Sequence, residues 1–245
     1  MKKLPYPKTY EEEFRYMPWG KLIQEVIEVI VKKTPQNAKV VDLMCGPGYL
    51  LGQIKKKRPD LKLKGVDINV GFIKYAREKY KEIIFEQADA LIWEPDGKYN
   101  VVICTAGLHH IPYEKQEEFV YKLHRLTDFD KQGFAIVADP YIDDYDRNYE
   151  KERKLAAAKL GYEYLLATMK NGAPNHIISA CIDIMHNDIM RDEYKTAAYY
   201  ARNIFFHYFN DIEMHQTWPK EEAKNITHAD FKSEYGDYYF VLTYS

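Results

Sequence analysis

Residues 40–50 constrain the fold more than any other part of the chain; they read Val-Val-Asp-Leu-Met-Cys-Gly-Pro-Gly-Tyr-Leu. An apolar run leads to Asp42, and a turn with glycines at Gly46 and Gly48 follows before a helix-like segment. A strand, a glycine-containing turn and a helix in this order are typical of an α/β unit whose ligand lies against the main chain. The pattern predicts a binding loop at the carboxyl end of a buried strand.

The spacing of the glycines and the charge of Asp42 favour a cationic ligand over a dinucleotide. The dinucleotide fingerprint G-x-G-x-x-G needs a third glycine at the position that Leu51 occupies here. A buried carboxylate beside the turn would also repel a pyrophosphate, whereas it would attract an ammonium or a sulfonium group. We therefore expect a positively charged ligand at this loop.

Strands and helices alternate through the middle of the chain, which predicts an α/β fold with a doubly wound, mostly parallel sheet. Asp42, Asp67, Asp89 and Thr105 all fall at the carboxyl ends of expected strands. Ligands of such sheets bind at this edge, so we expect the four side chains to share one cleft. The expected strands are 39–44, 61–68, 83–89, 101–105 and 134–139, and the expected helices are 49–57, 70–81 and 114–126.

Four motifs in this order resemble the class I S-adenosylmethionine-dependent methyltransferase family, in its small-molecule type. They are residues 40–48, 65–67, 88–90 and 99–112. The resemblance implies a Rossmann-like, seven-stranded sheet, S-adenosyl-L-methionine as cofactor and methyl transfer to a small molecule. One departure is Met44, since the family usually has glycine there.

The resemblance also implies which residues bind the cofactor. Asp42 and the glycine turn would hold the methionine end, and Asp67 would accept hydrogen bonds from the ribose hydroxyls. Asp89 and Ala90 would contact the adenine edge, and Thr105 would lie near the sulfonium. The full expected set is Asp42, Cys45, Gly46, Gly48, Asp67, Ile68, Asp89, Ala90, Thr105 and Leu108.

His109 and His110 are the candidate catalytic residues, because they follow the fourth expected strand, where the methyl group should lie. A histidine there could accept a proton from an attacking hydroxyl or amine near neutral pH. Alternatively, the pair only forms hydrogen bonds within its loop. Methyl transfer also proceeds without a base when positioning and exclusion of water supply the acceleration.

Residues 142–209 interrupt the alternation between the fifth and sixth strands, and we expect them to form a helical cap over the cleft. The pattern predicts helices at 145–169, 175–190 and 193–209, and final strands at 212–218 and 238–243. Within or beside this insertion, Tyr141, His176 and His186 are candidate substrate-binding residues. The alternative is that its aromatic residues pack a core or a dimer interface.

Residues 1–20 form an N-terminal arm rich in tyrosine and proline. Either it folds across the bound cofactor, or it only packs on the outside of the sheet. We expect one methyltransferase domain over residues 1–245, because the length suits one α/β domain with an insertion.

The composition of the chain limits the kinds of partner that we expect it to bind. A net charge of −2 gives no basic field for nucleic acid, and no apolar run reaches the length of a bilayer span. Three cysteines without metal-ligand spacing favour a reduced, cytoplasmic protein with no metal. The acids Asp139, Asp143 and Asp144 are close in sequence, but their spacing is typical of a cap or turn. A small-molecule substrate is expected, and a homodimer stays open.

Two other functions remain alternatives to methyl transfer. One is a relative that uses the same cofactor without methylating, as carboxy-S-adenosylmethionine synthases do, although the insertion shows no obvious arginine pair for a carboxylate. The other is a non-catalytic protein that keeps the cofactor as a structural ligand.

Overall fold

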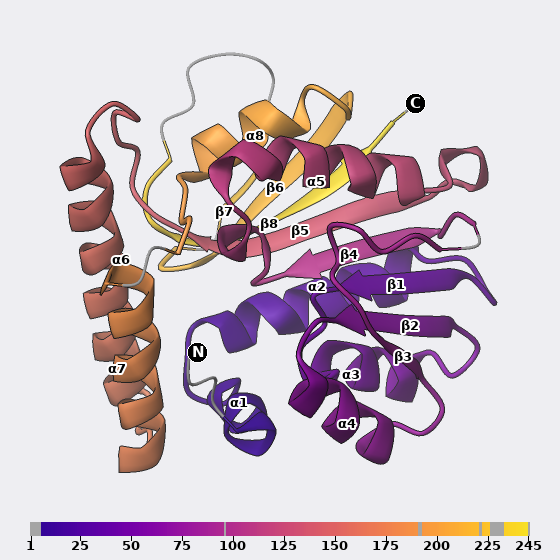
Figure 1. Ribbon diagram of the computed structural model, residues 1–245, viewed down its shortest axis with the longest axis horizontal. Coiled ribbons are helices and arrows are strands. Elements are labelled where there is room, and N and C mark those ends of the chain that lie inside the picture. The colour runs from indigo at the N-terminus through magenta and orange to yellow at the C-terminus, as the bar shows by residue number, and fades with distance from the viewer. Residues whose placement is uncertain (1–5, 96, 191–192, 221, 226–232, 245) are drawn as a thin grey trace.

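A single mixed sheet organises the computed structural model, which describes residues 6–95, 97–190, 193–220, 222–225 and 233–244 (Figure 1). In this described part, eight strands lie in the order β3-β2-β1-β4-β5-β8-β6-β7. The pairs from β3 to β5 are parallel, and β8 runs antiparallel between β5 and β6. The strands are β1 Lys39–Leu43, β2 Lys62–Asp67, β3 Ile84–Gln87, β4 Val101–Thr105, β5 Phe134–Tyr141, β6 Asp211–Trp218, β7 Glu222–Asn225 and β8 Gly236–Thr243.

Strand β1 lies in the middle of the parallel half because its side chains are apolar on both faces. Val40, Val41 and Leu43 are fully buried. Val40 and Val41 belong to different hydrophobic clusters, one on each face of the sheet. A strand buried on both faces reads as a continuous apolar run, which is what the sequence has here.

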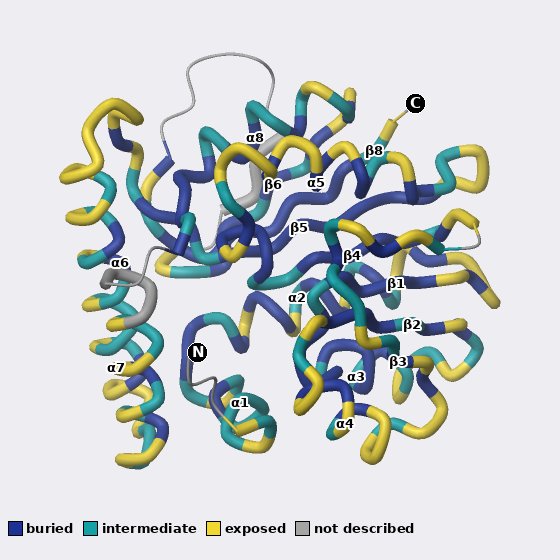
Figure 2. The backbone as a smooth tube through the Cα atoms, viewed as in Figure 1, coloured by how far each residue is buried: buried dark blue, intermediate teal, exposed yellow. Residues whose placement is uncertain are grey.

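Helices cover both faces of the sheet. α2 (Trp19–Lys33), α3 (Tyr49–Lys57) and α4 (Val70–Lys79) pack on one face, and α5 (Tyr113–Leu126) and α8 (Ala198–Phe205) pack on the other. Figure 2 shows the result: the strands are mostly buried, and exposed residues gather on the outer sides of the helices and at the turns.

The predicted seven-stranded, Rossmann-like sheet is confirmed, and the structure adds one short strand to it. β7 pairs antiparallel with β6, Glu213 lying opposite Asn225, and extends the edge of the sheet. The sequence analysis did not predict β7, because four residues at a sheet edge carry too little periodic signal.

The insertion between β5 and β6 begins with two long helices that lie side by side beyond the end of the sheet (Figure 1). These are α6 (Glu150–Lys170) and α7 (Asn175–Met190). In the described part of the chain, no helix combines the length and the apolar character needed to cross a membrane.

The predicted helix 193–209 is wrong at its start, since α8 begins only at Ala198. The preceding segment is extended and forms hydrogen bonds with other parts of the chain. The Tyr194 N–H donates to the His109 carbonyl (2.8 Å), and the Ile142 N–H donates to the Thr196 carbonyl (3.2 Å). These contacts override the local helical pattern and bring the segment beside the histidine pair.

Candidate cofactor and acceptor site

The turn after β1 depends on three residues with left-handed backbone conformations. Met44, Gly46 and Gly48 have φ angles of 63°, 54° and 81°. Glycine is required at Gly48 for a second reason, because a Cβ there would lie 2.7 Å from the Phe85 ring. The turn therefore stays narrow, and its backbone is open to a ligand.

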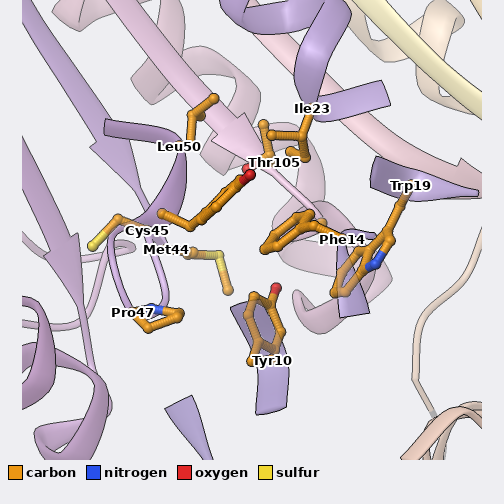
Figure 3. Close-up of a pocket in the computed structure, with 11 residues that line it drawn as sticks. Tyr10, Phe14, Trp19, Ile23, Met44, Cys45, Pro47, Leu50 and Thr105 are labelled. Carbon is orange, nitrogen blue, oxygen red and sulfur yellow. The ribbon is translucent and has the colours of Figure 1, made fainter. Parts of the chain in front are cut away.

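Met44 occupies a conformation that costs a side-chain-bearing residue roughly 1–2 kcal/mol. This explains in physical terms why glycine suits that position. The Met44 side chain lines a pocket together with Cys45 and Pro47, as Figure 3 shows. A strained residue that faces a pocket is typical of a functional loop.

Asp42 is fully buried, and neither of its carboxyl oxygens has a hydrogen-bond partner among the described residues. Burial raises the pKa of Asp42 well above its usual range, and the nearby charge of Asp67 raises it further. An unpartnered buried acid costs free energy unless a donor or a cation satisfies it. The site is therefore suited to a positively charged ligand.

Asp67, at the end of β2, is held by the backbone. The Gly46 N–H donates to Oδ2 (2.8 Å), and the Asn69 N–H donates to Oδ1 (2.7 Å). Burial raises the pKa of Asp67, and these two hydrogen bonds oppose that change. Each carboxylate oxygen can accept a further hydrogen bond, so Asp67 can receive two hydroxyl groups.

The N-terminal arm crosses the pocket at this turn. Tyr10 of α1 (Pro7–Glu13), Phe14 and Trp19 line the pocket opposite Met44, with Thr105 at the end of β4 (Figure 3). Phe14 stacks on Trp19, with ring centroids 5.1 Å apart. The arm therefore lies against the glycine turn, and its folding across a bound cofactor stays a prediction.

Glu13 adds a second buried acid that the sequence analysis missed. It is fully buried, and neither carboxyl oxygen has a hydrogen-bond partner among the described residues. Burial raises the pKa of Glu13 to about 8. Burial also raises the pKa of Tyr10, and the charges of Glu13, Asp67 and Asp42 raise it further, so these acids surround the Tyr10 phenol. No local sequence pattern predicts that Glu13 is buried, because its burial depends on how α1 packs against the rest of the chain.

The expected adenine side of the site is partly open. Ile68 follows Asp67 and is 65% exposed. Asp89 is half-buried, and its Oδ1 accepts a hydrogen bond from the Leu91 N–H (2.9 Å), while Ala90 is buried. An exposed isoleucine beside Asp67 offers an apolar surface for a flat ring.

Leu108, Cys45 and Cys104 contribute mainly to packing. Leu108 is buried in the cluster under α5 rather than in the pocket. Burial raises the pKa of both Cys45 and Cys104 well above the usual range. Neither thiol is therefore a ready nucleophile, as their apolar sequence context predicts.

His109 is oriented by Asp139. Their Nδ1 and Oδ1 atoms are 2.5 Å apart, and the His109 backbone N–H donates to Oδ2 (3.3 Å). Burial lowers the pKa of His109 to about 4, although Asp139 opposes that change. At neutral pH the ring is uncharged and donates from Nδ1, which leaves a lone pair on Nε2.

Glu193 completes this group from the segment before α8. Its Oε2 lies 3.4 Å from His109 Nε2, and its Oε1 lies 3.4 Å from His110 Nδ1. Asp139 was interpreted as a turn residue, and Glu193 was placed in a helix. Their place beside the histidines depends on contacts between segments that are far apart in the chain, namely the segment before α8 and the turn that follows β4.

The three predicted substrate residues do not line the described pocket. Tyr141 is buried in the core, where it packs edge-to-face against Tyr238 and Phe240. His176 is exposed and lies 3.1 Å from Glu12 of α1, and His186 is exposed on α7. Their roles in substrate binding stay predictions.

Comparison with known proteins identifies the central part of the chain. A family model described as a methyltransferase domain matches residues 40–129. The trans-aconitate 2-methyltransferase of Variovorax paradoxus is 31% identical over 110 residues, 44% of this chain and 40% of that protein. The carboxy-S-adenosyl-L-methionine synthase of Campylobacter hominis is 29% identical over 121 residues, 48% and 50% of the two chains. The chain thus matches about half the length of these curated relatives.

Solved structures extend the likeness to most of the fold. The magnesium protoporphyrin IX methyltransferase of Synechocystis with bound S-adenosylhomocysteine superposes with a TM-score of 0.57 at 16% identity, over 92% of this chain and 84% of that one. The N-methyltransferase NodS of Bradyrhizobium japonicum gives 0.57 at 8% identity, over 93% and 97%. These matches show that residues 40–129 are similar to a methyltransferase domain, and that the chain shares its fold with these solved methyltransferases.

Proposed function

We propose that this protein binds S-adenosylmethionine and transfers its methyl group to a small molecule. The observation that carries the proposal is a pair of buried acids without a hydrogen-bond partner among the described residues: Asp42 at the end of β1, and Glu13, whose charge acts on Tyr10 of the pocket. Such acids favour a ligand that brings a positive charge, and S-adenosylmethionine carries both a sulfonium and an ammonium group. The residues present therefore fit this cofactor.

The same geometry suggests a role for each predicted cofactor residue. Asp42, Glu13 and the turn around Cys45, Gly46 and Gly48 would hold the methionine end. Asp67 would accept the ribose hydroxyls, Ile68 would pack on the adenine, and Asp89 with Ala90 would contact its edge. Thr105 would lie near the reacting centre, and Leu108 would support the turn from the core.

The acceptor would bind on the side of His109 and His110. When bound, the cofactor supplies an already activated methyl group, so the chain must chiefly orient the acceptor and exclude water. The aromatic residues of the arm, Tyr10, Phe14 and Trp19, would exclude water from the cleft. His109 Nε2 and His110 would hold a proton or an acceptor atom.

The insertion would enclose the acceptor. α7 packs on the arm through Ile177, Cys181 and Met17, and His176 pairs with Glu12. The helical insertion and the arm therefore form one cover, which supports a small acceptor and a single domain over the whole chain.

A second candidate is a carboxy-S-adenosylmethionine synthase activity, which the Campylobacter hominis relative favours. Among the described residues, no arginine lines the pocket at the glycine turn. A carboxylated second substrate would lack its usual bidentate partner there. A third candidate, a non-catalytic cofactor-binding protein, keeps the same pocket without turnover.

One experiment separates these candidates. Purified protein is incubated with S-adenosylmethionine and a metabolite extract, and the products are analysed by mass spectrometry. We expect S-adenosylhomocysteine, and a matching methylated product, with the wild type and little with Asp67→Ala. A carboxylated cofactor would support the second candidate, binding without turnover the third, and absence of binding would refute the proposal.

A further inference from the structure

We propose that His109, His110 and Glu193 form a binding site for a divalent transition metal ion, with Asp139 as the residue that orients His109. One ligand atom from each of the three residues lies within 4.8 Å of the others. The two histidines come from the 3₁₀ helix η1 (Leu108–His110), and Glu193 comes from the segment before α8. Two imidazoles and a carboxylate are donors that suit zinc, iron, cobalt and related ions.

Two separations within the cluster are close to those between the ligand atoms of a coordinated metal, one to each oxygen of Glu193. Bonds of about 2.1 Å at tetrahedral angles place neighbouring ligand atoms about 3.4 Å apart. Glu193 Oε2 and His109 Nε2 are 3.4 Å apart, and Glu193 Oε1 and His110 Nδ1 are 3.4 Å apart. One ligand atom from each residue lies within 4.8 Å of the others, so an ion would draw the three side chains closer together on binding.

The contact with Asp139 turns the other ring nitrogen of His109 toward Glu193. Nδ1 lies 2.5 Å from Asp139 Oδ1, and Nε2 lies 3.4 Å from Glu193 Oε2. A histidine that donates from one nitrogen to a carboxylate and coordinates through the other is the usual arrangement at metal sites.

Hydrogen bonds from neighbouring residues hold η1 and the Glu193 segment close together. Buried Gln116 donates from Nε2 to the carbonyls of Ile111 (3.1 Å) and Tyr194 (3.2 Å). The Tyr113 hydroxyl donates to the Lys195 carbonyl (2.7 Å), and Arg153 donates to the Glu193 carbonyl (3.3 Å). Glu193 is therefore positioned by backbone contacts on both sides of the cluster.

Two neighbouring features affect an added cation. Lys195 is buried and close enough for its charge to lower the pKa of His109, so it opposes a cation at the cluster. The two carboxyl groups of Asp139 and Glu193 outnumber this one ammonium. The side chain of His110 is 38% exposed, so the site is reachable and an ion there would keep positions open for a small-molecule oxygen or nitrogen.

The test is titration of the full-length protein, freed of metal by a chelator, with Co²⁺. Coordination by two imidazoles and a carboxylate gives a visible absorption band, which Zn²⁺ should remove by displacement. We expect the band with the wild type and at least a tenfold weaker affinity with Glu193→Gln and with His110→Ala. Asp139→Asn should weaken binding about 10- to 100-fold, because it changes the orienting partner.

His207→Ala is the matched control, since His207 is exposed and pairs with Glu117 outside the cluster. It should bind Co²⁺ like the wild type. Absence of the band in folded wild type, or equal binding by the wild type and His110→Ala, would overturn the proposal. Cofactor affinity, measured in chelator, is a separate readout, so failure of the metal site is distinguishable from failure of the proposed function.

Discussion

The parallel half of the sheet and the covering region differ in how they encode their structure. In the parallel half, β1 and β4 are mostly apolar runs, and polar residues of the site lie at or near the strand ends, as Asp42 and Asp67 do. The cover is made of the arm and α6–α7; the arm contacts the pocket through aromatic side chains and packs on α7. The matched family model, residues 40–129, includes β1–β4 and neither the arm nor α6–α7.

This difference indicates that the two regions bind different parts of the ligands. Residues at strand ends are fixed by the sheet, so the ligand atoms they bind are determined locally. The cover depends on contacts between segments far apart in the chain, such as Met17 with Ile177. Under the proposed function, the sheet would determine the methyl donor, whereas the cover and the Glu193 segment would determine the acceptor.

Ile177→Ala should give the largest effect, because it should destabilise the cover and leave the parallel half of the sheet unchanged. Ile177 is fully buried between α7 and the arm, and removing such a side chain costs about 2–5 kcal/mol. We expect faster hydrogen exchange in the arm and in α6–α7, with β1–β4 unchanged. Ile182→Ala, on the exposed side of the same helix, is the control and should have little effect. Equal loss of protection in β1 would contradict this difference between the two regions.

Because of Glu13, which lies in the arm, we expect the folding stability of the protein to depend on pH. Its folded pKa of about 8 lies above the ordinary value of 4.5, so the folded chain keeps a proton that the unfolded chain has lost. The stability of the ligand-free protein should therefore be complete below about pH 4.5 and fall as the pH rises through 8, by at most about 1.4 kcal/mol per pH unit.

Glu13→Gln should flatten this dependence in denaturant titrations from pH 5 to pH 8. Binding of a cationic cofactor should also release protons from the wild type, which calorimetry in buffers of different ionisation enthalpy measures. An unchanged pH profile in the variant would show that Glu13 is not the titrating group.

Substitutions of Met44 should have the smallest effect on stability, and they test the role of its left-handed backbone conformation. Met44→Gly relieves the left-handed strain but loses packing and adds chain entropy, so stability should change by less than about 1 kcal/mol. Met44→Ala loses packing without relieving the strain, and should be the less stable variant. Thermal denaturation compares the two, and an alanine variant at least as stable as the glycine variant would refute the role of the φ angle.

Sequence reasoning predicted the sheet and its binding edge because both follow from local patterns. Asp42, Gly48 and Asp67 stand at strand ends or in a turn, where residue type and position suffice. Glu13 and Glu193 escaped prediction because only packing between distant segments buries them. The helix expected from residue 193 failed for the same reason, since hydrogen bonds to His109 and Ile142 hold that segment extended.

The most direct test of the central claim is calorimetric titration of S-adenosylmethionine into the wild type, Asp67→Ala and Asp130→Ala. Asp67 would make two hydrogen bonds from its carboxylate to the ribose, so its loss should weaken binding by at least about 100-fold. Asp130 is exposed at the far end of the chain's β4–β5 connection, and its variant should bind like the wild type. Thermal denaturation confirms that each variant is folded. Equal affinity of folded Asp67→Ala and the wild type would contradict the proposed cofactor site.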